Sequence, residues 1–440
     1  MLNKYTVQLM ALGIAGSLGA TAFANDSALI DALVKKGVLK SKEAEQIRAE
    51  AAKSKQSSTG KLNLDSSVKS LTLSGDFRVR YNYASGTGRD PMSGQGTGDN
   101  VGVPAGNSTH NTFYDTRLRI NADYKLSDDF YAGFGLRTRQ DQRNDNVLMG
   151  SSNAMGAGGS DFGIGIYRAF LGWHPVEGVE LVAGAQKNPF YTTDLVWDVD
   201  YNPIGFSQKI DLDKTLGVSG IELSLVSGQF ILQNNDENNA ATPASLNNNR
   251  DAFLWQTQLV AGIDLGAAKL TVAPGYLASN AGAAGAATNG LTDSNNVQVL
   301  LIPGDVTGEI AGLKAKFEWD FAYNFEGRDR SGLGTSSKGT DRLAWLVGAR
   351  LGENKKQGDF SVLANYRQTG QGALPQNLSD NEIGFGNSRN VGALKVGAAY
   401  SLSDSSYFGL NYLRFSRVNS NVAPNFDNGE WLQAEIGVKF

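Results

Sequence analysis

From residue 70 to the end of the chain, hydrophobic and polar side chains alternate with a period of two. In LTLSGDFRVRYNY, residues 71–83, leucine, phenylalanine, valine and tyrosine take one set of alternate positions, and threonine, serine, aspartate, arginine and asparagine take the other. The same alternation fills residues 116–126 and 313–325. Because successive side chains of a strand point to opposite faces, each segment predicts a strand with one apolar and one polar face.

The strand lengths and the aromatic positions indicate that the apolar face meets lipid. The alternating runs exceed ten residues, which is longer than the usual globular strand but fits the roughly 9–11 residues that cross a bilayer at a tilt. Aromatic side chains on the apolar face gather near the strand ends, as in the interfacial girdles of membrane barrels. They are Tyr81 and Tyr83 at one end and Tyr124, Phe130, Trp173 and Phe440 at the other. The pattern predicts an all-β fold, a transmembrane antiparallel up-and-down barrel.

The connections between these strands alternate between short and long, as they do in outer-membrane barrels. The predicted short turns are 127–129, 175–178, 226–228, 266–269, 354–359 and 403–406. The predicted long loops are 84–111, 140–161, 188–215, 235–249, 280–295, 326–340, 370–388 and 418–428. Both ends of the barrel then fall on the short-turn side, the periplasmic side of such proteins.

Counting with this alternation predicts about sixteen strands. They are 71–83, 112–126, 130–139, 162–174, 179–187, 216–225, 229–234, 250–265, 268–279, 296–302, 308–325, 341–353, 359–369, 389–402, 406–417 and 429–440. Eighteen strands, with the extra ones inside 188–215, are the alternative. An open sheet edge is not tolerated in hydrocarbon, so the last strand should pair with the first and close the barrel.

The residues before the barrel have a different character. Lys4, the short apolar run at 9–16 and Ala22-Phe23-Ala24 are typical of a signal peptide, residues 1–24, that is cleaved before Asn25. Residues 25–67 are predicted to form a periplasmic helical segment with its linker, either a short solvated helical pair or a segment that oligomerises or blocks the pore. The barrel then occupies 68–440.

Composition excludes several classes of protein. The formal net charge of −4 lacks the basic excess of a nucleic-acid-binding protein. The absence of cysteine excludes disulfides, thiolate metal sites and cysteine nucleophiles. After residue 24 there is no run of 18 apolar residues, so no transmembrane helix is predicted.

Several segments resemble one known family. The signal peptide, LIDALVKKGVLKSKEAEQIRAE at 29–50, the stretch from GAQKNPF to DLVWDVDYNP within 184–203 and the terminal GVKF are similar to the Putative porin family of Gram-negative outer-membrane barrels. The resemblance implies a water-filled diffusion pore, a lipid bilayer with lipopolysaccharide around it, and a homotrimer as the assembly. It also implies that Phe440 is read as an insertion signal by the outer-membrane assembly machinery.

A barrel of this size encloses water, so the charges on its inward face should carry the function. Seven arginines lie on that face of the first four strands, against Asp76, Asp115 and Asp123. They are Arg78, Arg80, Arg117, Arg119, Arg137, Arg139 and Arg168. Arginine keeps its charge at any working pH and binds carboxylates and phosphates bidentately. The sequence predicts an arginine wall with a mild preference for anions, or arginines that only pair with nearby acids and stiffen the wall.

The loop at 188–215 carries three acids, Asp194, Asp198 and Asp200, among aromatic residues and prolines. Such apolar content favours a loop that folds into the lumen and narrows it, with its acids opposite the arginines. A transverse field of this kind orients dipolar solutes and rejects apolar ones. Glu318 and Asp320 are predicted to line the pore and to limit the anion preference.

The sequence gives little support for metal binding or catalysis. Asp198, Asp200 and Asn202 begin like a calcium loop, but Pro203 and Lys209 stand where the turn glycine and the bidentate glutamate should be, so an ordinary turn is favoured. His110 and His174, the only histidines, are predicted at opposite ends of the barrel, and no nucleophile or paired-histidine motif occurs. We expect no cofactor, no metal and no enzymatic activity.

The sequence therefore predicts an outer-membrane porin, exported through a Sec-type signal peptide, that passes small hydrophilic solutes and ions by diffusion. Two alternatives remain. One is a substrate-specific channel, which would need an aromatic track or a tight charge cluster. The other is a structural or adhesive barrel whose lumen is occluded and whose long loops bind partners.

Overall fold

The computed structural model describes the chain from residue 68 onward, with gaps. The described ranges are 68–87, 108–139, 145–149, 163–217, 219–233, 252–279, 297–326, 339–375, 378–379, 382–383, 388–419 and 428–440. The predicted signal peptide and the predicted helical segment at 25–67 lie outside these residues.

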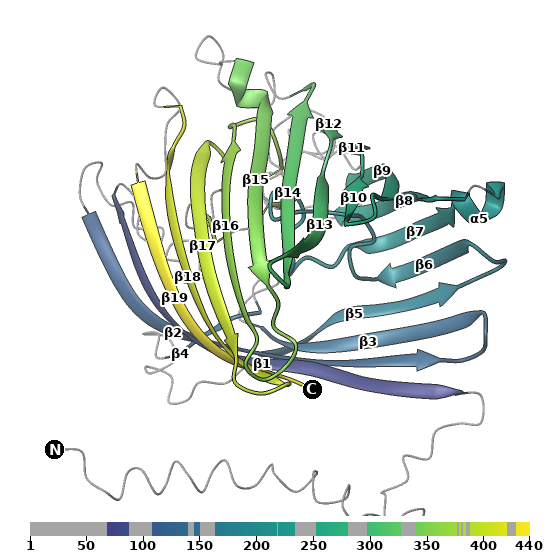
Figure 1. Ribbon diagram of the computed structural model, residues 1–440, viewed down its shortest axis with the longest axis horizontal. Coiled ribbons are helices and arrows are strands. Elements are labelled where there is room, and N and C mark those ends of the chain that lie inside the picture. Colours follow the sequence, from purple (N-terminus) through teal and green to yellow (C-terminus); the bar gives the residue numbers. More distant parts are fainter. Residues whose placement is uncertain are drawn as a thin grey trace, which may run out of the picture. The chain divides into compact units, whose positions relative to one another are not determined.

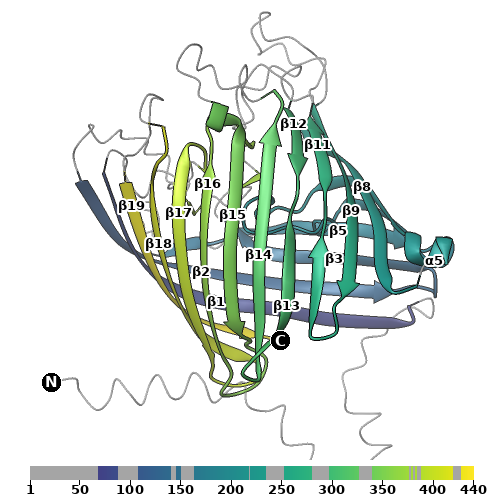
Figure 2. The ribbon, with the colours of Figure 1, turned by 45° about the horizontal axis from the view of Figure 1, so that its top comes forward.

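The described strands form one antiparallel sheet that closes on itself (Figures 1 and 2). In chain order they are β1 (Ser70–Thr87), β2 (Ser108–Lys125), β3 (Phe130–Arg139), β4 (Val147–Met149), β5 (Gly163–Trp173), β6 (Val179–Ala185), β7 (Ile204–Asp211), β8 (Ile221–Gln233), β9 (Ala252–Asp264), β10 (Ala268–Val272), β11 (Gly275–Ser279), β12 (Val297–Leu301), β13 (Gly304–Ile310), β14 (Leu313–Asn324), β15 (Leu343–Gly352), β16 (Phe360–Thr369), β17 (Val391–Ser401), β18 (Ser406–Arg417) and β19 (Asn428–Lys439). A helical turn, α5 (Leu212–Leu216), joins β7 to β8, and a 3₁₀ turn, η5 (Gly339–Arg342), precedes β15.

These segments build a barrel of sixteen strands, as predicted. Two strands are interrupted where proline removes a backbone donor, at Pro274 between β10 and β11 and at Pro303 between β12 and β13. The ladder continues across both breaks, because the proline carbonyls accept hydrogen bonds from Leu259 (2.9 Å) and Ala273 (2.9 Å). The short β4 pairs with β2 beyond the end of the β2–β3 ladder.

Closure joins the first strand to the last. β1 pairs with β19 from Asp76 opposite Lys439 to Thr87 opposite Asn428. The backbones of Gly75 and Phe440 extend this ladder with reciprocal hydrogen bonds of 2.8 and 3.1 Å. Only glycine fits at position 75, because a Cβ there would lie 2.5 Å from the Phe440 ring and against the Arg119 carbonyl. The predicted pairing of 429–440 with 71–83 is confirmed.

The outer and inner faces follow the predicted alternation. Outward residues such as Leu73, Ile166 and Phe317 are exposed, whereas inward residues such as Arg80 and Asn82 are buried. Near the short turns, the outward rings of Phe130 and Trp173 stack with centroids 5.6 Å apart. An apolar exterior around polar inward positions is the arrangement of a barrel that stands in lipid.

The prediction was wrong around residue 215. Residues 204–211, expected to lie in a long loop, form β7, and the expected turn at 226–228 lies inside β8. Val226 is buried in the interior, and a Cβ on Gly228 would lie 2.5 Å from the Phe230 ring. Gly228 therefore permits a close approach within a strand and does not mark a turn. One strand, β7, was not predicted, and one strand, β8, was predicted as two. The two errors cancel, so the predicted number of sixteen strands is correct.

Two smaller boundaries also differ. The chain turns at Ala311–Gly312, so residues 308–310 belong to β13 and not to the strand that follows. His110, expected in a long loop, lies in β2, because β1 and β2 extend beyond the predicted ends.

The interior contains a large apolar core, which the sequence reading did not predict. Inward side chains of β8, β9, β11, β12, β14 and β15 pack against two loops that enter the barrel, L3 (186–203) and the described part of L7 (370–390). The buried residues of this core are Phe190, Leu195, Val196, Trp197, Val226, Phe230, Leu254, Leu277, Val297, Val299, Leu301, Ala322, Ala344, Leu346, Ala373, Leu374 and Leu378. One side of the barrel interior is therefore filled with side chains.

A second apolar cluster joins the strands around the closure to Ile383 of L7. It comprises Ala84, Phe113, Ile383, Val391, Ala393, Leu413, Phe415 and Trp431. The indole of Trp431 donates a hydrogen bond to Asn82 (3.0 Å) and packs beside Phe113. Among the described residues, no helix is long and apolar enough to span a membrane.

Candidate functional site: the constriction and its vestibule

L3 is held inside the barrel first by aromatic packing. The ring of Trp197 lies 6.0 Å from that of Phe190 and 6.1 Å from that of Phe230 on β8, and its Nε1 donates a hydrogen bond to Gln256 on β9 (2.7 Å). Trp197 has a φ of 69°, a left-handed conformation that costs a bulky residue about 1–3 kcal/mol. Because the side chain is almost fully buried, its packing offsets that cost.

Hydrogen bonds fasten the beginning of L3 to the same side of the barrel. Tyr191 donates its hydroxyl to Asp305 (2.5 Å), and its backbone N–H and C=O both bond the side-chain amide of Gln258 (2.8 and 2.9 Å). Thr193 donates to Asp320 (2.8 Å). Asp320 is thereby buried beneath L3, so the expectation that it lines an aqueous pore was wrong. Glu318, two residues away, is partly exposed and pairs with Lys316 (2.7 Å).

The acids of L3 reach two different parts of the opposite wall. Asp194 accepts hydrogen bonds from Lys395 on β17 (3.2 Å) and Asn365 on β16 (3.4 Å), and its backbone carbonyl accepts one from Arg367. Lys395 beside it holds the pKa of the Asp194 carboxyl below its usual range, against the effect of burial. The ion pair holds the middle of L3 to β17, and the hydrogen bonds from Asn365 and Arg367 hold it to β16.

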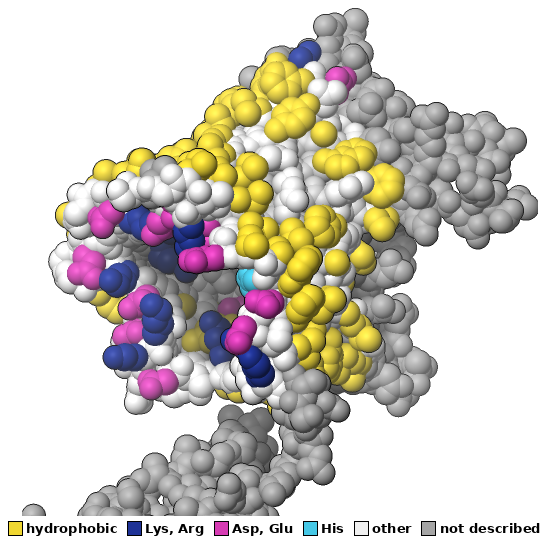
Figure 3. Space-filling model, turned by 90° about the vertical axis from the view of Figure 1, so that its right-hand side faces the viewer, with side chains coloured by type: hydrophobic (Ala, Val, Ile, Leu, Met, Phe, Trp, Pro, Cys, Tyr) yellow, Lys and Arg dark blue, Asp and Glu magenta, His cyan; other side chains and the backbone are white. Residues whose placement is uncertain are grey.

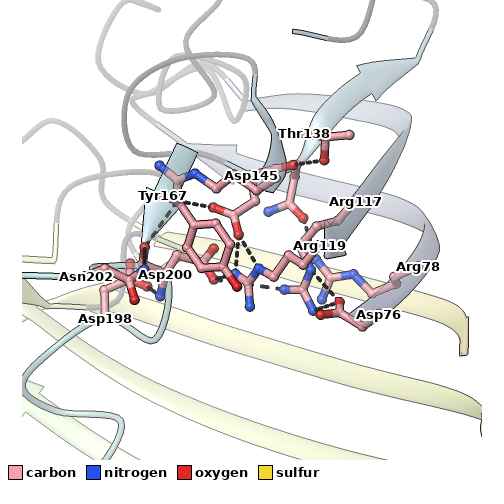
Figure 4. A network of polar contacts seen from close by, with 12 residues as sticks. Asp76, Arg78, Arg117, Arg119, Thr138, Asp145, Tyr167, Asp198, Asp200 and Asn202 are labelled. Atoms are coloured by element: carbon pink, nitrogen blue, oxygen red, sulfur yellow. Dashed lines mark hydrogen bonds and ion pairs between the residues drawn. The ribbon is translucent and has the colours of Figure 1, made fainter. Parts of the chain in front are cut away.

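Asp200 meets the arginines of β2 directly (Figure 4). It pairs with Arg119 and lies 3.9 Å from Arg117. Asp198 supports this position, because its carboxylate accepts a hydrogen bond from the Asp200 backbone N–H (2.9 Å). This is an aspartate turn of the ordinary kind, as favoured over a calcium loop.

Six of the seven arginines expected on the wall have described side chains, and these six face inward and each pair with an acid. Arg78 pairs with Glu435 (3.3 Å), Arg80 with Asp115 (2.9 Å) and Glu382 (2.5 Å), Arg117 with Asp76 (2.7 Å), Arg119 and Arg137 with Asp145, and Arg168 with Asp123 (2.8 Å). Arg139 ends β3, and its side chain lies outside the described residues. The wall is thus a network of alternating charges and not an unpaired row of cations.

L7 adds an acid that no sequence pattern indicated. Glu382 lies against Arg80, and although burial alone would raise the pKa of its carboxyl, Arg80 lowers that pKa to about 2. Together with L3 it borders a cavity of about 190 Å³. Basic side chains on this cavity are Arg78, Arg80, Arg117 and Lys395, and acidic ones are Asp194, Asp198, Asp200, Glu382 and Glu435.

Tyr167 is a further residue that the sequence reading missed. The β3–β5 ladder shifts register between Gly135 and Leu136, and the extra residue on β5 is Tyr167. This β-bulge directs Tyr167 and Arg168 to the same face. The Tyr167 ring lies 5.9 Å from the guanidinium of Arg119 and 5.7 Å from that of Arg137. The signal in the sequence is a change of phase in the alternation, because the outward apolar residues are Ile164 and Ile166 before the bulge and Leu171 and Trp173 after it.

A wider cavity of about 640 Å³, the vestibule, lies at the short-turn end. It is lined by Asp123, Lys125, Tyr131, Arg168, Phe170, His174, Glu180, Lys187 and Lys209, among others. Viewed from the side of the β2–β3 turn, the molecule shows a hollow rimmed by acidic and basic side chains beside hydrophobic surface (Figure 3). His174 stacks on Tyr131 in this vestibule, whereas His110 lies beside Tyr83. In the described part of the chain, no group of three or more acidic, histidine or cysteine side chains could hold a metal ion.

An apolar exterior, a closed ladder and a charged interior narrowed by an inward loop define a transmembrane barrel of the porin type. Residues 62–278 match the family model described as Putative porin, which confirms the resemblance stated from the sequence. No curated protein matches the chain.

The solved structures that are similar to this chain include two outer-membrane porins. The high-pH structure of Pseudomonas putida OprB is 9% identical, with 84% of this chain and 94% of that chain covered and a TM-score of 0.51. The Salmonella typhi OmpF complex with daunomycin is 12% identical, with 86% and 99% covered and a TM-score of 0.46. The likeness to OprB shows a shared barrel fold.

The Asp194–Lys395 pair generates a pH prediction. A carboxyl whose pKa is lowered keeps its charge, and hence the pair, until the pH falls through that lowered pKa. The Lys395→Gln variant lacks the main cause of the lowered Asp194 pKa. The Asp194 carboxyl should therefore become neutral at a higher pH than in the wild type, and L3 should be held less firmly at that pH. We expect open-channel current noise to rise at a higher pH in Lys395→Gln than in the wild type.

The control is Lys269→Gln, which removes an exposed pair with Glu222 that does not touch L3. Its noise should follow the wild type. An identical pH dependence in Lys395→Gln and the wild type would show that the pair does not hold L3.

Proposed function

We propose that the protein is an outer-membrane porin through which small hydrophilic solutes and ions diffuse passively. The observation that carries this proposal is the charged constriction inside a closed barrel, where L3 reaches from the apolar core to the arginines of β2. The charged side chains along such a passage can form hydrogen bonds with water and polar solutes, whereas apolar solutes make no favourable contact with them. Where opposite charges around the cavity are not in direct contact, they produce a local transverse field that orients dipolar solutes.

The same pairing argues for weak ion selectivity. The arginine wall considered alone favours anions, but L3, L7 and β19 bring carboxylates to the same cavity. Charges that neutralise one another at contact distance contribute little to the field experienced by a passing ion. The anion preference is therefore smaller than the arginines alone suggest.

Three further properties belong to this proposal. Phe440, exposed beside the β1–β19 closure, serves as the insertion signal for the outer-membrane assembly machinery. The apolar exterior contacts the bilayer and lipopolysaccharide. The assembly is a homotrimer, as the family resemblance implies.

A structural barrel with an occluded lumen is the second candidate. The apolar core around L3 and the cluster around Trp431 favour it, because both fill part of the interior. The two candidates differ in whether the charged passage conducts.

Deleting residues 193–201 tests whether L3 constricts the pore. This deletion removes Asp194, Trp197 and Asp200 together, so the single-channel conductance should rise. The matched control deletes nine residues at 282–290, between β11 and β12, and should conduct like the wild type. Folding of each variant is checked by its mobility on unheated gels. Unchanged conductance in the folded 193–201 deletion would contradict the constriction.

Asp200→Asn tests the balance of charge. Removing the acid that contacts Arg119 and Arg117 leaves an excess of positive charge at the constriction. The reversal potential in a salt gradient should shift toward anion selectivity relative to a weakly selective wild type. Asp213→Asn, the same charge change on α5 away from the constriction, should leave the reversal potential unchanged. A strongly cation-selective wild type would falsify the proposed role of the arginines.

A further inference from the structure

Three glycines on β3 and β5 are each covered by an aromatic ring. A Cβ built on Gly172 would collide with the ring of Tyr131, one on Gly133 would lie 2.8 Å from the ring of Phe170, and one on Gly135 would lie 2.5 Å from the ring of Tyr167. In each case the wall beneath the ring is bare backbone, so the ring lies close against the sheet.

The strand register produces this arrangement. Tyr131 is directly opposite Gly172, and Gly133 is directly opposite Phe170. The bulge that follows brings Tyr167 over Gly135. Cross-strand residues on one face lie about 5 Å apart, so an aromatic residue opposite a glycine can fold over it. The rings therefore follow one another along the inner wall, from the vestibule at Tyr131 toward the arginines at Tyr167.

His174 extends the series at the short-turn end. Its ring is nearly parallel to that of Tyr131, at 25° with centroids 5.4 Å apart, and Tyr131 lies 6.0 Å from Phe170. We call Tyr167, Phe170, Tyr131 and His174 the aromatic track. Phe170, Tyr131 and His174 line the vestibule, and Tyr167 lies beyond it, beside Arg119 and Arg137.

Paired charges accompany the track. The hydroxyl of Tyr131 donates to Glu180, the hydroxyl of Tyr167 donates to Asn121 (2.5 Å), and Arg168 lies over the Phe170 ring (5.3 Å) while it pairs with Asp123 (2.8 Å). Carboxylates and a guanidinium thus stand beside the rings, and the pairing leaves little net charge to attract an ion. A neutral solute that carries many hydroxyl groups can use both the acceptors and the donors.

We propose that the aromatic track binds pyranose rings of neutral sugars on their way through the pore. The inference rests on the proposed function and deepens it, because it names a solute class for the same passage. One face of a pyranose presents C–H groups that pack on an aromatic ring, while its hydroxyls reach Glu180, Asp123 and Arg168. The vestibule of about 640 Å³ falls within the volume range of small-molecule sites.

Covering the glycines also protects their backbone and stabilises the sheet, so a purely structural role for the rings is the competing explanation. The two roles make different demands on the rings. A structural role requires only that the glycines be covered, whereas a binding role requires that sugars contact the rings and that binding weaken when a ring is removed.

Single-channel recording with maltotriose tests the proposal. We expect added maltotriose to interrupt the ion current of the wild type reversibly. Tyr131→Ala and Phe170→Ala should each raise the dissociation constant about tenfold, which corresponds to the loss of one favourable ring contact. Tyr131→Phe keeps the ring and loses only the hydroxyl, so its dissociation constant should stay within a few-fold of the wild type.

Phe134→Ala is the matched control. Phe134 lies on β3 close to Tyr131, but its ring is exposed on the exterior, stacks on Tyr124 and does not line the vestibule. Its removal should leave maltotriose binding unchanged. Mobility on unheated gels verifies that every variant is folded.

The outcomes separate the explanations. An ion-conducting wild type with no maltotriose effect would show that the rings only cover glycines, and would overturn the track while leaving the porin intact. Interruption by benzoate but not by maltotriose would overturn the assignment to neutral sugars. If no current flows, the proposed function fails, and the track is then tested by calorimetric titration of the detergent-solubilised protein with maltotriose. A heat of binding in the wild type that disappears in Tyr131→Ala would support the track. No heat of binding in the wild type would overturn it.

Discussion

The structure depends on one constraint, that a strand crossing hydrocarbon must have every backbone N–H and C=O paired. Closure of β1 on β19 meets this constraint, and the ladder even continues through two proline breaks. Once the barrel is closed, the alternation of side chains places one face in lipid and the other inside. Polar and charged residues are then confined to the interior, which is why the functional chemistry of this chain lies there.

L3 divides the interior of the barrel into an apolar side and a charged side. Trp197, Phe190 and their neighbours fasten the loop to one side by apolar burial, which is strong but has no direction. Asp194 and Asp200 fasten it to the other side by charge pairs, which fix geometry more than they add stability. An apolar core and a charged passage therefore lie side by side in one barrel, and the loop that separates them supplies side chains to both.

Much of this architecture could be predicted from the sequence because it follows from a period of two. The orientation of the faces, the pairing of the last strand with the first and the inward arginines of β1 and β2 all belong to that pattern. β7 was missed because it directly follows the aspartates and prolines of L3, and Gly228 imitated a turn although it only makes room for Phe230. The apolar core and the partner of Arg80 in L7 depend on loop positions in three dimensions. No local pattern records those features.

The central claim is that the passage runs beside the arginine wall while the side around β15 is dry. The chain contains no cysteine, so single cysteines can report on it. Leu346→Cys lies in the apolar core and Asn411→Cys on the charged cavity, and both face inward. A charged, water-soluble thiosulfonate reagent should modify Asn411→Cys and reduce the single-channel current, while Leu346→Cys in the folded protein should remain unmodified. Equal modification at both positions would show that water fills the whole barrel and would contradict the account.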